Sequence, residues 1–204
     1  MGNPLNRRDI IVIGASAGGA TALIQLVSQF PPDLRASVFV VVHLPTGPSN
    51  LSEILSRSCP LPAIEAVQGQ LIEPGTIYVA PPDRHLLIEN GRNLVWNGPK
   101  ESRHRPAINP LFRSAAAGYG ERVVGIVLSG ILEDGTTGLW WIHRYGGITV
   151  VQDPFEAEFD QMPQTALKHV QIDYVLGVSK MGPLLVDLTN GRRPVMELDR
   201  FTGT

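Results

Sequence analysis

The stretch from Asp9 to Gly19, Asp-Ile-Ile-Val-Ile-Gly-Ala-Ser-Ala-Gly-Gly, constrains the fold of this chain more than any other stretch. Its first half is a run of β-branched residues, which is typical of a strand buried on both faces. Beyond the glycines, apolar residues recur at the spacing of one helical face, namely Leu23, Leu26, Val27 and Phe30. The stretch therefore predicts a buried strand that turns sharply into a helix close to Ser16.

The turn at Ser16 allows three interpretations. A dinucleotide-binding fingerprint would need glycine at Ser16, between Gly14 and Gly19, because a side chain there obstructs the approach of pyrophosphate. Gly14 to Gly18 also fits the Gly-x-Ser-x-Gly elbow, which exposes a nucleophilic serine beside the N–H groups of a helix N-terminus. In the third interpretation Ser16 is only the N-cap of the helix. The local sequence leaves the nucleophile and the N-cap open.

The composition indicates a globular protein of one domain. At 204 residues and 43% hydrophobic content, the chain is long enough for an α/β domain with a substantial core. The formal net charge of −2 gives no electrostatic reason to expect nucleic acid or an anionic membrane as a partner. The single cysteine, Cys59, excludes an internal disulfide and suits a reducing cytoplasm.

The uncharged stretch from Ile10 to Pro32 is long enough to be mistaken for a membrane span. Its glycines, its two glutamines Gln25 and Gln29 and its closing prolines favour a core strand followed by a core helix instead. The N-terminus also lacks the basic region, apolar region and cleavage site of a signal peptide. We therefore expect a cytoplasmic protein without membrane insertion.

Strands alternate with helices along the rest of the chain. Apolar runs predict strands at 37–43, 62–67, 76–80, 123–129, 148–151 and 174–177. Helical spacing predicts helices starting at Ser49 or Asn50 and at Pro106, and others over 139–142, 162–170 and 181–188, with a more polar, loosely attached tail from Thr189. Residues 85–89 and 92–96 flank Asn90-Gly91 and predict a hairpin. The fold class is therefore α/β, with a doubly wound, mostly parallel sheet and a small antiparallel hairpin insertion.

Three chemically active side chains follow predicted strands: Ser16, His43 and Asp134. The carboxyl ends of parallel strands meet at one edge of a sheet, where ligand sites lie. A serine hydroxyl needs an imidazole to remove its proton, and the imidazole needs a carboxylate to fix its tautomer. Asp153 competes for the carboxylate role, although Pro154 beside it favours a structural turn, and Asp134 has the alternative role of capping its own helix.

The other four histidines are poorer candidates, because surface or packing roles are commoner at such positions: His85 by the hairpin, His104 in a basic loop, and His143 and His169 on helices. No spacing of histidine and cysteine resembles a metal site. The basic loop around Arg103 and Arg105 is, taken alone, more often a solvated surface than a site.

An ordered set of motifs extends from about Ile10 to Leu188. Its members are Ile13-Gly14-Ala15-Ser16-Ala17-Gly18-Gly19, Val42-His43-Leu44-Pro45, Val79-Ala80-Pro81-Pro82-Asp83-Arg84-His85-Leu86-Leu87, His104-Arg105-Pro106, Leu111-Phe112-Arg113-Ser114-Ala115-Ala116, Leu128-Ser129-Gly130 with Asp134-Gly135, and Met162-Pro163. In this order the motifs resemble the catalytic domain of the CheB family of bacterial chemotaxis protein-glutamate methylesterases.

The resemblance implies a triad with Ser16 as nucleophile, His43 as general base and acid, and Asp134 as the orienting carboxylate. It implies hydrolysis of glutamate methyl esters on methyl-accepting chemoreceptors with release of methanol, and glutamine deamidation as a second activity. The backbone N–H groups of Ala17 and Ile131 are the candidates for stabilising the oxyanion.

Recognition of the substrate is assigned to the basic loop, where Arg103 and Arg105 are candidates for contacting acidic residues around a methylation site. We expect chemoreceptors as partners, and no cofactor, metal or nucleic acid. The family's receiver domain is absent from this sequence, so we expect a single CheB-type catalytic domain over residues 1–204, with its core at about 9–188.

The chain also departs from the family pattern. Ala17 stands where the family usually has Thr, and Ser129-Gly130-Ile131-Leu132 replaces Thr-Gly-Met-Gly. Ala107 and Asn109 stand for the usual Ser and Asp. Two alternatives therefore accompany the methylesterase: a serine carboxylesterase of other specificity, although the α/β-hydrolase type orders its triad Ser, Asp, His, and a non-catalytic docking module.

Overall fold

The computed structural model describes residues 7–43 and 47–192. Its strands are β1 Ile10–Ala15, β2 Ser37–Val42, β3 Ala63–Glu65, β4 Ile77–Val79, β5 His85–Glu89, β6 Arg92–Trp96, β7 Val123–Val127, β8 Ile148–Gln152 and β9 Tyr174–Leu176. Its α-helices are α1 Gly19–Val27, α2 Leu51–Ser58, α3 Ile108–Tyr119, α4 Thr136–Arg144, α5 Gln161–His169 and α6 Val178–Thr189. The expectation of a loosely attached tail from Thr189 is wrong at Thr189 itself, which is buried at the end of α6. The tail beyond 192 lies outside the described residues.

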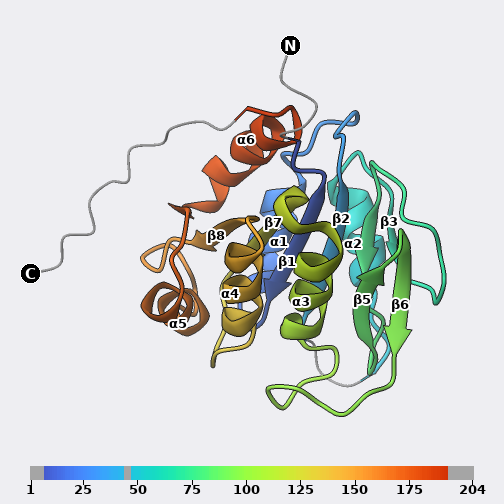
Figure 1. Ribbon diagram of the computed structural model, residues 1–204, viewed down its shortest axis with the longest axis horizontal. Helices are drawn as coiled ribbons and strands as arrows, with labels where there is room; N and C mark the ends of the chain where they lie inside the picture. Colours follow the sequence, from blue (N-terminus) through green and yellow to red (C-terminus); the bar gives the residue numbers. More distant parts are fainter. Residues whose placement is uncertain (1–6, 44–46, 193–204) are drawn as a thin grey trace, which may run out of the picture.

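Seven strands form one sheet in the order β3-β4-β2-β1-β7-β8-β9. Every neighbouring pair in this sheet is parallel. Strands β5 and β6 form a separate antiparallel hairpin, which Figure 1 shows to the right of the central sheet. The prediction of a doubly wound parallel sheet with a hairpin insertion is confirmed.

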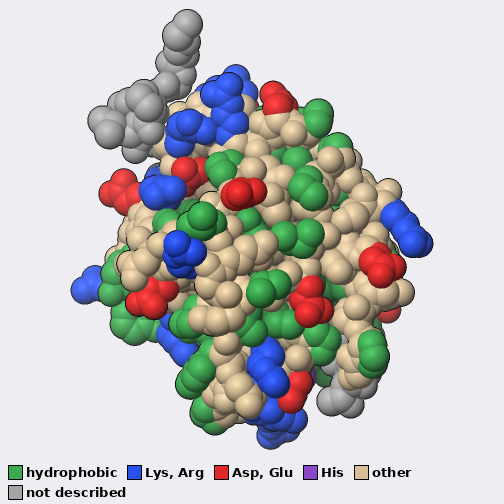
Figure 2. Space-filling view, turned by 90° about the vertical axis from the view of Figure 1, so that its right-hand side faces the viewer, with side chains coloured by type: hydrophobic (Ala, Val, Ile, Leu, Met, Phe, Trp, Pro, Cys, Tyr) green, Lys and Arg blue, Asp and Glu red, His purple; other side chains and the backbone are tan. Residues whose placement is uncertain are grey.

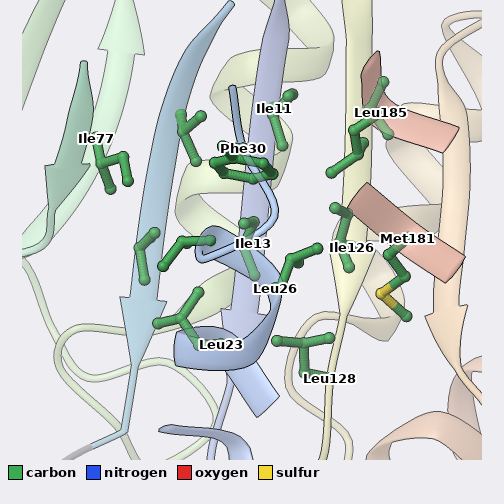
Figure 3. Packing of buried hydrophobic residues seen from close by; sticks show 14 of the residues in the cluster. Ile11, Ile13, Leu23, Leu26, Phe30, Ile77, Ile126, Leu128, Met181 and Leu185 are labelled. Carbon is green, nitrogen blue, oxygen red and sulfur yellow. The ribbon is translucent and has the colours of Figure 1, made fainter. Parts of the chain in front are cut away.

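Helices cover both faces of the sheet, so each central strand is buried on both sides. In Figure 1, α3 and α4 lie in front of the sheet and α1 and α2 behind it. In β1 the side chains alternate between two cores: Ile11 and Ile13 pack with α1 and α6, whereas Ile10 and Val12 pack with α3. Figure 3 shows the first core, where Leu23 and Leu26 of α1 lie over β1. The unbroken apolar run of β1 follows from this double burial.

Some predicted boundaries are wrong by a few residues. Helix α3 begins at Ile108 rather than at Pro106. The first N–H groups of a helix have no partner within the helix, and here those of Ile108 and Asn109 donate to the Asp134 carboxylate, which fixes the start of the helix at Ile108. The start of α2 agrees with the prediction: its N-cap is Asn50, and the hydroxyl of Ser49 accepts the N–H of Leu51 at 3.2 Å.

The order of the strands reverses between β1 and β7. From β1 the chain continues to β2 on one side, and from β7 it continues to β8 on the other. Loops at the carboxyl ends of β1 and β7 therefore leave in opposite directions, and doubly wound folds bind their ligands at such a point. Among the described residues, no helix is long and apolar enough to cross a bilayer. The face in Figure 2 carries basic side chains interspersed with acidic ones, in keeping with the small net charge.

Candidate active site

Ser16, His43 and Asp134 meet at the carboxyl edge of the sheet. The imidazole Nδ1 of His43 lies 3.3 Å from the Ser16 Oγ, and its Nε2 lies 2.9 Å from the Asp134 Oδ2. A carboxylate can only accept, so Nε2 carries the proton that is donated to Asp134. The neutral ring then has its lone pair on Nδ1, which faces Ser16 and can accept the hydroxyl proton.

Strand register places the serine and the histidine side by side. Ala15 of β1 is opposite Val42 of β2, so the residues that follow the two strands are neighbours. The backbone bonding continues past the strand ends, where the N–H of His43 donates to the Ala15 carbonyl at 3.0 Å. On the other side, the N–H of Ser16 donates to the Ser129 carbonyl at 3.0 Å, which joins the serine turn to the loop after β7.

The Asp134 side chain is buried, with 1% exposure, and accepts four hydrogen bonds. Its Oδ1 accepts the N–H groups of Asn109 at 3.1 Å and Gly135 at 3.0 Å, and its Oδ2 accepts those of Ile108 at 2.7 Å and His43 at 2.9 Å. Two of the donors are the first N–H groups of α3, whose dipole favours an anion there. The alternative that Asp134 caps its own helix α4 is wrong, since Gly135 is that N-cap and α4 has no side-chain cap.

Asn109 fixes the loop that carries Asp134. The residue is 7% exposed, and its Oδ1 accepts the N–H groups of Gly135 at 3.1 Å and Gly138 at 2.8 Å at the start of α4. Asn109 thus ties the start of α4 to the start of α3, with Asp134 between them. The sequence carried no signal for this role beyond the departure from the family pattern at Asn109.

The Ser16 turn is an elbow and not a helix cap. The N-cap of α1 is Gly18, in the left-handed region at φ 69°, and α1 has no side-chain cap. The carbonyl of Ser16 accepts the N–H of Gly19 at 2.9 Å, which closes the turn and directs the hydroxyl toward His43. The interpretation of Ser16 as an N-cap is therefore wrong.

Gly130 permits the close approach of the loop after β7 to the serine turn. A Cβ added at Gly130 would stand 2.8 Å from the Cβ of Ser16 and would overlap the sulfur of Met162. The hydroxyl of Ser129 donates to the Ala17 carbonyl at 2.8 Å and accepts the N–H of Phe159 at 2.9 Å. These contacts lock three loops around Ser16.

The two oxyanion candidates lie in these loops. Within the described ranges, the backbone N–H groups of Ala17 and Ile131 donate to no protein acceptor. The neighbouring N–H of Gly130 is occupied by the Phe159 carbonyl at 2.9 Å. Ala17 follows the serine directly, so its N–H is available at the position where an elbow places its first oxyanion donor.

The competing carboxylate, Asp153, closes a turn. Its Oδ1 accepts the N–H of Phe155 at 2.9 Å, and its own N–H donates to the Leu176 carbonyl at 2.9 Å. The carboxylate bonded to His43 is that of Asp134.

The two candidate arginines have different surroundings. Arg105 donates to the Asp83 carboxylate at 2.8 Å and to the Gly98 carbonyl at 2.7 Å, so its charge is already paired. Arg103 is exposed and lines an open cavity of about 510 Å³. The other lining residues are Ser102, Leu132, Glu133, Gln161, Gln164 and Thr165.

His104 lies in the site, against the expectation that it was a poor candidate. Its ring is stacked on that of His43, with centroids 3.6 Å apart and planes at 6°. Burial, and then the charge of His43, lower the pKa of His104 below its usual value. His85 has the expected packing role, with Nε2 donating to the Pro99 carbonyl at 2.8 Å and Nδ1 accepting the Ala107 N–H at 3.2 Å. No group of three or more metal-binding side chains occurs in the part of the chain that the structure describes.

A hydroxyl, an imidazole and a buried carboxylate bonded in series at the edge of a doubly wound sheet are the arrangement of the serine hydrolases. Comparison with known proteins identifies one family within the serine hydrolases. A sequence model described as CheB methylesterase matches residues 11–185, and the chain therefore belongs to the CheB methylesterase family of carboxylic ester hydrolases. The predicted family and hydrolase class are confirmed.

Relatives and a solved structure agree with this membership. The Methanosarcina mazei protein named protein-glutamate methylesterase/protein-glutamine glutaminase 2 is 36% identical over 190 residues, which are 89% of this chain and 52% of that protein. A Leptospira interrogans protein, also named as a protein-glutamate methylesterase/protein-glutamine glutaminase, is 35% identical to this chain. The match covers 88% of this chain and 94% of that protein. The crystal structure of the Thermotoga maritima CheB methylesterase catalytic domain has a TM-score of 0.84, at 31% identity, over 88% of this chain and 98% of that one.

The chain spans about half the length of several of the curated relatives that it matches, as the Methanosarcina mazei protein and the Ralstonia nicotianae protein, covered to 47%, illustrate.

Proposed function

We propose that this chain hydrolyses glutamate methyl esters on chemoreceptors, and deamidates glutamine side chains as a second activity, with Ser16, His43 and Asp134 as its catalytic triad. The observation that carries the proposal is the hydrogen-bonded series Ser16–His43–Asp134 on a CheB-family fold. The names of the relatives, which pair glutamate methylesterase with glutamine glutaminase, supply the substrate class.

Acylation begins as the Ser16 Oγ attacks the ester carbonyl while Nδ1 of His43 takes the hydroxyl proton. Nε2–H stays bonded to Asp134, whose negative charge stabilises the imidazolium. The N–H groups of Ala17 and Ile131 stabilise the oxyanion. Collapse of the tetrahedral intermediate breaks the C–O bond, and the imidazolium gives its proton to the departing methoxide, which leaves as methanol.

Deacylation repeats these steps with water. Nδ1 of His43 accepts a proton from water as the water oxygen attacks the glutamyl ester of Ser16. The second tetrahedral intermediate then releases the glutamate and returns the proton to the Ser16 Oγ. With a glutamine substrate, ammonia takes the place of methanol in the first half.

Substrate recognition involves the exposed Arg103 rather than the paired Arg105. Arg103 and Glu133 line the open cavity and directly precede His104 and Asp134 in the chain, so a charged protein surface can dock there against the two loops that carry these residues. Arg105, bonded to Asp83 and Gly98, stabilises the loop instead. The open form of the cavity suits an ester presented by a large partner more than a small molecule.

The test is an assay of methanol release from methylated chemoreceptors. The chain should release methanol, Ser16→Ala should release none above background, and the control Ser28→Ala, at an exposed serine after α1, should retain wild-type activity. A serine-directed phosphonate should label Ser16. Hydrolysis of small esters without methanol release would point to a carboxylesterase of other specificity, and neither turnover nor labelling would point to a docking module.

A further inference from the structure

Both ring nitrogens of His43 are bonded, so only the two faces of its ring remain for other contacts. Nδ1 faces Ser16 and Nε2 faces Asp134, and 4% of the His43 side chain is exposed. The ring of His104 lies flat on one of these faces, 3.6 Å away between centroids and 6° from parallel. The contact is a full ring-to-ring stack and not an edge contact.

A rigid turn holds His104 in this position. The backbone groups of Glu101 and His104 bond to each other in both directions, at 3.1 and 2.8 Å. Between them, Ser102 and Arg103 both have positive φ, 48° and 69°, as the two central residues of a type I′ turn do. The Glu101 carboxylate is bonded by both terminal nitrogens of Arg113 on α3, each at 2.8 Å. This two-pronged pairing anchors the turn to the helix below it.

The chain is also fixed just after His104. Arg105 donates to Asp83 and Gly98, and the N–H of Ala107 donates to His85. His104 is therefore held on both sides, by contacts that do not involve the triad.

We propose that His104 is a positioning residue for His43: its neutral ring keeps Nδ1 directed at Ser16 and stabilises the positive charge that His43 carries during turnover. The inference rests on the proposed function of Ser16 and His43. A cation over an aromatic face is attracted by the negative face of the ring, more strongly where water is excluded. Here the cation is the imidazolium that forms when His43 takes the serine proton.

The stack stabilises this charge only while His104 is neutral. Burial is the first cause that lowers the pKa of His104, and the charges of His43 and Lys100 lower it further, whereas Asp134 raises it. His43 follows β2, Lys100 lies in the loop before α3, and Asp134 lies in the loop after β7. Two positive rings with centroids 3.6 Å apart repel each other, so a charged His104 would disfavour the imidazolium of His43 instead of stabilising it.

The experiment compares His104→Leu, which removes the aromatic face, with His104→Phe, which keeps a flat ring that cannot titrate. With a small neutral ester, His104→Leu should lower kcat about 2- to 30-fold and leave KM within about two-fold, because the lost attraction acts only on the charged state of His43. His104→Phe should stay within about three-fold of wild type. His169→Leu, at an exposed histidine on α5, is the matched control and should change neither constant.

Two further readouts distinguish positioning from support of the fold. In His104→Leu, the acid limb of the rate of phosphonate labelling at Ser16 should move to lower pH, because protonated His43 has lost its stacking partner. An NMR titration of the His43 ring signals should move in the same direction, while His104→Phe should leave both unchanged.

Equal losses in His104→Leu and His104→Phe, or wild-type behaviour of His104→Leu in both pH titrations, would overturn the proposal. A wild-type chain that the phosphonate does not label would instead contradict the proposed function. The NMR titration needs no turnover, and it would still decide the role of His104.

Discussion

Asp134→Asn tests the geometry of the triad, because the substitution keeps the shape of the side chain and removes one acceptor atom. Four donors converge on the carboxylate: Asn109 and Gly135 on Oδ1, Ile108 and His43 on Oδ2. A carboxamide has one oxygen and one NH2 group, so one pair of donors must face another donor.

The two orientations of the amide have different consequences. With its oxygen toward Asn109 and Gly135, the NH2 group faces Ile108, whose N–H is left without an acceptor, and forces Nε2 of His43 to accept. The His43 proton then moves to Nδ1 and points at Ser16, so the base is lost. With the amide reversed, His43 keeps its tautomer and the N–H of Gly135 keeps its bond to the Asn109 Oδ1, but the N–H of Asn109 and the NH2 group itself are left without an acceptor in a buried site.

The first orientation leaves fewer unpaired groups, so it should dominate. The wrong tautomer predicts a fall in kcat of about 10³- to 10⁴-fold. An unpaired buried N–H costs about 1–3 kcal/mol, and loss of the charge weakens the remaining bonds by about 1 kcal/mol. The free energy of unfolding should fall by about 2–4 kcal/mol, which lowers Tm by roughly 4–16 °C in a chain of this length.

The assay is kcat for a small neutral ester, with Tm from circular dichroism. Asp153→Asn is the matched control, since an amide oxygen can still accept the N–H of Phe155, and it should keep kcat within about two-fold. An Asp134→Asn variant that keeps a tenth of the wild-type kcat, or an Asp153→Asn variant that loses as much as Asp134→Asn, would refute the assignment of the carboxylate.

Three other outcomes are expected. Gly130→Ala should lower Tm by roughly 2–12 °C, because its Cβ would stand 2.8 Å from the Cβ of Ser16 and overpacking costs about 1–3 kcal/mol; an unchanged thermal melt would contradict the close approach. Arg103→Glu should weaken turnover of receptor substrate, most at low salt, and should leave hydrolysis of a small neutral ester unchanged. Arg105→Glu should lower both activities, because the ion pair of Arg105 with Asp83 is structural. Matching salt-dependent profiles for the two variants would remove this distinction. Folding lowers the pKa of His104 from 6.5, so below about pH 6.5 the unfolded chain binds more protons than the folded one, and the free energy of unfolding should fall there. Urea unfolding at pH 5.5 and 7.5 should show a smaller fall for His104→Phe than for wild type. An identical pH dependence of the two would show that His104 does not contribute.

Much of the fold could be predicted from local sequence. The β-branched run of β1, the alternation of strands with helices and the Asn90-Gly91 turn each depend on neighbouring residues alone, and the structure has all three. The hairpin limits, 85–89 and 92–96, agree with the prediction to the residue, because a two-residue turn sets its own register. Helix ends were harder: the start of α3 is decided by Asp134, which is 26 residues away from Ile108.

The candidate site also has one part that local sequence predicted and another part that depends on contacts between distant residues. Ser16, His43 and Asp134 stood out in the sequence because each follows a strand, and parallel strands bring their carboxyl ends to one edge. The choice of Asp134 over Asp153 required the tertiary structure, because both follow strands and only packing against α3 shows which carboxylate bonds His43.

His104 belongs to the family motif His104-Arg105-Pro106, but nothing in the sequence placed it against His43. The two residues stand 61 positions apart and meet through a turn that is anchored to α3. Arg103 and Arg105 also look alike in the sequence. Only the fold, which brings Asp83 beside Arg105, shows that Arg105 is paired and that Arg103 is exposed. Periodicity and strand order determine where reactive groups gather, because they depend on neighbouring residues. Contacts between distant loops decide which of those groups bond to each other, and such contacts leave no periodic trace in the sequence.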